Sequence, residues 1–176
     1  MDVGQRSGGQ VDSLEIRTHG IANSAQYAGL GWREIPVPVI AAVHGVAFGG
    51  GLQVALGADI RIVPPEVQLS VLEIKWGLVP DMAGVVLLTE LLRADVARDL
   101  AFSGRIVGGE EAVRIGLATR LAENPLAAAR ALAQEIAGRN PDAIRAAKRL
   151  FNGASPVDAR SVLLAESHEQ ARLIGS

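Results

Sequence analysis

The pattern of apolar and polar residues divides the chain into a part that mixes strands with helices and a later part that is helical throughout. Residues 39–43 form a continuous apolar run, which is typical of a strand buried on both faces. Residues 59–63 alternate and predict a second strand, and residues 68–71 predict a third. Helical patterns in this part cover residues 52–56, 83–92, 94–102 and 109–115.

Before the first strand, residues 13–34 have a helical pattern, with Ser13 as a possible cap and three glycines that weaken it. Pro36 and Pro38 interrupt the pattern, and Pro38 also pushes Val37 toward an extended conformation.

From residue 125 onward the pattern is helical. Pro125 suits the first turn of a helix and Gly138 suits the end of one, and further helices are expected over residues 141–151 and 156–174. This order predicts an α/β fold with a helical C-terminal region. It gives three sections: a leader and helix over 1–35, an α/β core over 36–124 and a helical region over 125–176.

Composition narrows the function classes. The net charge of −2 gives no basic footprint for nucleic acid, so no nucleic-acid partner is expected. The chain has no cysteine, which excludes disulfides and thiolate chemistry. No apolar stretch reaches the roughly 18 residues of a membrane span, and the Gly- and Gln-rich start lacks a signal-peptide core. We therefore expect a cytoplasmic protein that does not enter a membrane.

Three successive glycines, Gly49, Gly50 and Gly51, stand between the apolar run and a short helix. Free backbone N–H groups at a helix start can bind an anion, so the run is a candidate ligand site. A tight turn that needs glycine for packing alone explains it equally well. The spacing does not match a phosphate-binding loop, a dinucleotide fingerprint or a nucleophile elbow.

Two carboxylates lie farther along the chain. Glu73 follows the third strand, where it is either a general base among apolar neighbours or a solvated charge at a strand end. Asp81 follows Pro80 and precedes a helix, so it is also a natural helix cap. The histidines are isolated and show no metal spacing, so no metal site is expected.

Residues 38–61, PVIAAVHGVAFGGGLQVALGADIR, resemble the signature of the crotonase superfamily, the enoyl-CoA hydratase/isomerase group. The resemblance continues through residues 69–80, 102–106, 111–118 and 140–141, and covers most of the chain from 35 to 153. It implies the ClpP/crotonase fold and an acyl-CoA thioester as substrate, with no separate cofactor.

The resemblance also implies roles for particular residues. A backbone N–H of the glycine run, at Gly50 beside Gly49, would hold the thioester oxygen in an oxyanion hole. Hydratases of the family use two glutamates, at the positions of Glu73 and Gln53, and Gln53 cannot accept a proton. Asp81 matches a catalytic aspartate of dienoyl-CoA isomerases. One carboxylate suffices to move a double bond, so we expect Glu73 to be the base and isomerisation to exceed hydration.

The same resemblance implies a homotrimer or a hexamer. Nothing before Pro36 resembles the family segment that supplies the second oxyanion N–H, and the family's last C-terminal helix has no counterpart, so the chain resembles a truncated member. The alternative is a non-catalytic relative with a binding or assembly role. Arg139, Arg145, Lys148 and Arg149 form a basic stretch that suits either a CoA phosphate or a solvated helix face.

Overall fold

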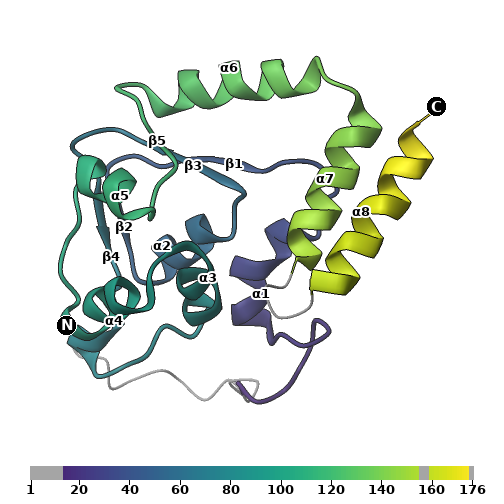
Figure 1. Cartoon of the computed structure of the whole chain (residues 1–176). Coiled ribbons are helices and arrows are strands. Elements are labelled where there is room, and N and C mark those ends of the chain that lie inside the picture. The colour runs from purple at the N-terminus through teal and green to yellow at the C-terminus, as the bar shows by residue number, and fades with distance from the viewer. Residues whose placement is uncertain (1–13, 155–158, 175–176) are drawn as a thin grey trace.

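The structure is a computed structural model that describes residues 14–154 and 159–174. Two helical elements come first, short parallel strands then alternate with helices, and helices alone complete the chain (Figure 1). The strands are β1 (Ile40–Ala42), β2 (Val46–Phe48), β3 (Ile60–Val63), β4 (Gln68–Ser70) and β5 (Arg120–Leu121). The helices are α1 (Ser24–Leu30), η1 (Gly31–Arg33), α2 (Gly50–Leu56), η2 (Glu73–Trp76), α3 (Gly84–Leu91), α4 (Ala94–Ser103), α5 (Gly109–Ile115), α6 (Pro125–Ala137), α7 (Pro141–Gly153) and α8 (Ala159–Leu173).

The strands form two parallel sheets, with the orders β1-β3-β5 and β2-β4. The chain passes from β1 to β2 through Gly45, whose φ of +65° lies in the left-handed region that glycine favours. It later passes from β3 to β4 in the same way. In this second passage β3 pairs with β1, and β4 pairs with β2. Both passages lead to a helical element, α2 after β2 and η2 after β4, and this repeat places the starts of the two elements near each other.

The main core lies where α2, α3, α4 and α5 pack against the strands. Leu52 and Leu56 of α2, Leu87 of α3 and Leu100 of α4 are fully buried in it. A smaller cluster joins α6 to the three-stranded sheet at Ile62. In Figure 1, α6 runs along the side of β1 and β3 opposite α2, and α7 packs beside α8 at the C-terminal end.

The predicted helix over 13–34 is mostly wrong. Residues 18–22 turn back on themselves, with Gly20 at a φ of +61° and paired backbone bonds between His19 and Ala22. Helix α1 begins only at Ser24, where Asn23 and Gln26 form a capping box. The proposed cap Ser13 lies outside the described residues.

The other expected helices and strands are confirmed with shifts of a few residues at their ends, including Pro125 in the first turn of α6 and Gly138 at its end. The expectation of a fully buried first strand is wrong, because β1 lies at an edge of its sheet and is only half-buried. Strands β2 and β5 were not expected. The α/β class and the helical C-terminal region are confirmed.

Candidate active site

The glycine run forms the junction between β2 and α2. Gly49 has a φ of +53° and its N–H donates to the Ser70 carbonyl at 3.0 Å. The first bond of α2 runs from the Gln53 N–H to the Gly49 carbonyl at 3.0 Å. The N–H groups of Gly50, Gly51 and Leu52 precede that bond, so they have no acceptor within the helix. They are the donors that an oxyanion would meet here.

Gln53 lies one turn into α2 and is only 1% exposed. Its side-chain Oε1 accepts the backbone N–H groups of Met82 at 2.8 Å and Gly84 at 2.9 Å. Its Nε2 donates to Oε1 of Glu73 at 2.5 Å. One amide therefore connects α2 to the turn before α3 and to the candidate base.

Glu73 is the first residue of η2 and is 9% exposed, so the interpretation as a solvated charge at a strand end is wrong. Its carboxyl group lies against Gly49, where an added Cβ atom would be 3.1 Å from Glu73 Oε1. The positive φ favours glycine at position 49, and a larger residue there would also press on the Glu73 carboxyl group. Among the described residues, Glu73 Oε2 is the only buried side-chain nitrogen or oxygen without a hydrogen-bond partner. A buried orphan oxygen is uncommon and points to a functional group.

Asp81 is exposed, and its side chain makes no hydrogen bond or ion pair with any residue in the described ranges. It is not a helix cap, because α3 begins after Ala83, whose positive φ of 68° sets the start of the helix without a side-chain bond. The structure therefore brings Gly49, Gly50, Gln53 and Glu73 together and leaves Asp81 outside their hydrogen bonds.

Sequence reasoning missed three residues that shape this site. Gly84 lies so close to Gln53 that a Cβ atom on it would be 2.5 Å from Gln53 Oε1. Met82 places its sulfur 2.8 Å from where a Cβ of Gly50 would be. Gly29 lets α1 pack against this turn, since its Cβ would be 2.5 Å from the Met82 carbonyl. Only the glycines themselves gave a signal in the sequence.

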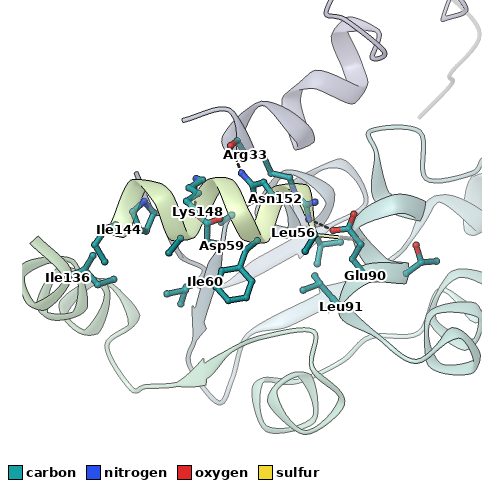
Figure 2. A pocket seen from close by; sticks show the side chains of 17 residues that line it. Arg33, Leu56, Asp59, Ile60, Glu90, Leu91, Ile136, Ile144, Lys148 and Asn152 are labelled. Atoms are coloured by element: carbon teal, nitrogen blue, oxygen red, sulfur yellow. Dashed lines mark hydrogen bonds and ion pairs between the residues drawn. The ribbon is translucent and has the colours of Figure 1, made fainter. Parts of the chain in front are cut away.

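A cavity of about 940 Å³ lies elsewhere, between α7, the end of α2 and the end of α3. Figure 2 shows its mixture of aliphatic walls and paired charges. Lys148 Nζ donates to the Trp32 and Val37 carbonyls at 3.1 and 2.9 Å and to Asp59 Oδ2 at 2.8 Å. A second ion pair in this cavity joins Arg33 to Glu90, so these two charges also neutralise each other.

Neither this cavity nor the three smaller ones beside α7 is lined by Glu73. We place the candidate site at Glu73 rather than in the 940 Å³ cavity, because the charged groups of that cavity are already paired with one another. The basic stretch is likewise paired. Lys148 is buried against Asp59, whereas Arg139, Arg145 and Arg149 pair with acidic residues on the helix surface.

The described residues contain no group of three or more His, Cys, Asp or Glu side chains placed to hold a metal ion. None of their helices has the length and apolar character needed to cross a bilayer.

Comparison with known proteins shows the family of the chain. The family model for enoyl-CoA hydratase/isomerase matches residues 20–174. A carnitinyl-CoA dehydratase from Salmonella typhi is 37% identical over 124 residues, which are 69% of this chain and 48% of the relative. The chain therefore belongs to the enoyl-CoA hydratase/isomerase family, within the crotonase superfamily. It spans about half the length of the curated relatives it matches.

Solved structures show the same fold. An enoyl-CoA hydratase from Bacillus anthracis superposes with a TM-score of 0.82 at 28% identity, covering 86% of this chain and 60% of that one. A Thermobifida fusca YX protein of the enoyl-CoA hydratase type, solved in complex with CoA, gives a TM-score of 0.79 at 36% identity, with 85% and 59% covered. The crotonase fold expected from the sequence is confirmed.

Proposed function

We propose that the protein acts on an enoyl-CoA thioester and moves its double bond, with Glu73 as the base and the Gly50 N–H as an oxyanion donor. The observation that carries the proposal is Glu73 Oε2, a buried carboxylate oxygen without a partner, beside the unbonded N–H groups at the start of α2. The thioester is the substrate, and no separate cofactor is needed.

The reaction needs one base. Glu73 Oε2 removes a proton from C2 of a 3-enoyl-CoA, and the C–H electron pair passes into the thioester to give a dienolate. The Gly50 N–H donates to the thioester oxygen as negative charge develops there. Glu73 then returns the proton to C4, and the double bond lies between C2 and C3. Atoms and charges balance without an oxidant or a second carboxylate.

The experiment compares two conversions by the 176-residue chain: 3-enoyl-CoA to 2-enoyl-CoA, and water addition to 2-enoyl-CoA. We expect isomerisation to be the faster, because Gln53 stands where a second glutamate would be needed for hydration. Faster hydration would contradict the proposed reaction.

Dehydration or hydration is the second candidate, and one observation favours it. The carnitinyl-CoA dehydratase from Salmonella typhi is a relative at 37% identity. The same assay decides between the two when carnitinyl-CoA is included as a substrate. A non-catalytic role is the remaining alternative; it predicts CoA-thioester binding without turnover, which isothermal titration calorimetry beside the activity assay would detect.

We further propose that the chain assembles as a trimer or a pair of trimers, in the cytoplasm. Exposed apolar side chains support an assembly, with Phe151 on α7 and Leu163 and Leu164 on α8 among them. Symmetric association is the usual way to bury such repeated surfaces. Light scattering coupled to size-exclusion chromatography should give three or six times the monomer mass, and a monomer at micromolar concentration would contradict this proposal.

A further inference from the structure

The side-chain amide of Gln53 has only one workable orientation. Two backbone donors, the N–H groups of Met82 and Gly84, face the atom assigned as Oε1 at 2.8 and 2.9 Å. Turning the amide over would place its NH2 group against both donors, leaving buried N–H groups unsatisfied. Because the orientation is fixed, Nε2 must point at Glu73.

This arrangement divides the two oxygens of Glu73. Oε1 accepts the Gln53 amide at 2.5 Å, whereas Oε2 is buried without a partner. One oxygen is thus held in place, and the other is left to react.

We propose that Gln53 is a positioning residue that makes Glu73 a base with a single reacting oxygen, and that this oxygen both removes and returns the substrate proton. The inference rests on the proposed function and adds to it a determinant of reaction specificity. Gln53 does not itself touch the reacting atoms; it acts through Glu73.

Two consequences follow for the reaction. No acid or hydroxyl among the described residues is hydrogen-bonded to Oε2, so a proton on this oxygen has no side chain to exchange with during the lifetime of the dienolate. A deuterium taken from C2 should therefore reappear at C4. Water addition, in contrast, needs a further group to deprotonate water, and the amide of Gln53 is unable to do so. The hydrogen bond from Gln53 to Glu73 should therefore suppress hydration while permitting isomerisation.

The decisive variant is Gln53→Glu. A glutamate keeps an oxygen for the Met82 and Gly84 N–H groups, so the fold keeps its connection between α2 and α3. Its other oxygen would face Glu73 Oε1 at the distance where Nε2 now donates. Two carboxylates this close cannot both be ionised, so the pair must share a proton.

We expect three changes in Gln53→Glu. Infrared difference spectra at pH 7 should show a protonated carboxyl band that the parent lacks and that disappears when Glu73→Gln is added. The deuterium found at C4 should fall, because the shared proton opens a route for exchange. The ratio of hydration to isomerisation should rise by about 10²-fold, the range expected for one added acid/base group.

A second variant disturbs Gln53 while leaving the side chains of Gln53 and Glu73 chemically unchanged. In Gly84→Ala the new Cβ would lie 2.5 Å from Gln53 Oε1, so the amide must move. Loss of positioning should lower kcat by about 10-fold or more while KM changes little, because the base is misplaced but the thioester is still bound. Gly153→Ala is the matched control, since a Cβ there meets nothing within 4 Å, and its kinetics should equal those of the parent.

The outcomes separate the two proposals. If the parent converts neither enoyl-CoA, the proposed function fails, and the infrared band of Gln53→Glu still decides whether the two side chains form a coupled pair. If the parent isomerises but Gln53→Glu shows no protonated carboxyl, unchanged deuterium transfer and an unchanged product ratio, the role of Gln53 is overturned. The role of Gln53 would also be overturned if Gly84→Ala and Gly153→Ala had the same kcat and the same KM.

Discussion

Two buried polar groups in this protein have opposite hydrogen-bond states. Lys148, 7% exposed, gives its ammonium group to two backbone carbonyls and to Asp59, which also accepts the Val39 N–H at 2.6 Å. Glu73, at 9% exposure, is buried to a similar degree but leaves one carboxylate oxygen unpaired. The Lys148 ammonium group therefore has all of its hydrogen bonds made, whereas the Glu73 carboxylate does not.

The difference separates stability from chemistry. A buried ammonium with three acceptors has no bonding capacity left for a ligand, and it connects α7 to β3 and to the segment before β1. An unpaired buried oxygen costs about 1–3 kcal/mol, which a purely structural residue would avoid. We therefore expect changes at Lys148 to alter folding and changes at Glu73 to alter turnover.

Lys148→Met should have the largest effect. It removes one partner of a buried ion pair and leaves two carbonyls without their donor, so the free energy of unfolding should fall by about 3 kcal/mol or more. For a chain of this size the melting temperature should drop by at least about 6 °C. Calorimetry measures it, with Arg149→Ala, an exposed basic residue on the same helix, as the control. Equal stability of the two variants would contradict the structural role of Lys148.

Glu73→Gln should have the next largest effect, and on a different quantity. The variant keeps the shape and the bond from Gln53 but is unable to carry a proton, so turnover of 3-enoyl-CoA should fall by about 10²-fold or more. The melting temperature should change by less than about 4 °C, equivalent to about 1 kcal/mol. Near-normal turnover on every enoyl-CoA tried would show that Glu73 is not the base.

Asp81→Asn should have the smallest effect. Asp81 is exposed and unbonded within the described residues, so both stability and turnover should stay within about 0.5 kcal/mol of the parent, roughly a twofold change in rate. Steady-state kinetics check this expectation. A loss as large as that of Glu73→Gln would instead restore Asp81 as the second acid/base group suggested by the family resemblance.

A third buried charge lies in the strand that the alternation in residues 59–63 predicts. Arg61 is only 4% exposed. Its guanidinium donates to the carbonyls of Leu56, Ala58 and Leu117, and burial lowers its pKa. These carbonyls lie at the end of α2 and before β5, so the cation favours the negative end of that helix. The alternation along the strand predicts where the strand lies. It does not predict the carbonyl groups that surround Arg61.

The sequence by itself determined the family, the α/β order and the place of the glycine run, because these depend on local spacing and on residues that are near neighbours in the chain. It also determined that only one of the two hydratase carboxylates is present. The helix expected before residue 24 failed because a glycine turn competes with a weak helical pattern there.

Only the tertiary structure decided how these residues act. Gln53 meets Glu73 across 20 residues and Gly84 across 31, and Lys148 meets Asp59 across 89. No local pattern encodes such pairs. Gln53 reaches Glu73 because the parallel strands β2 and β4 end at the same edge of their sheet, whereas Gly84 and Lys148 are brought in by the packing of α3 and α7. That folding buries Glu73, fixes the amide beside it and leaves one oxygen unpaired, while the same folding leaves Asp81 in solvent.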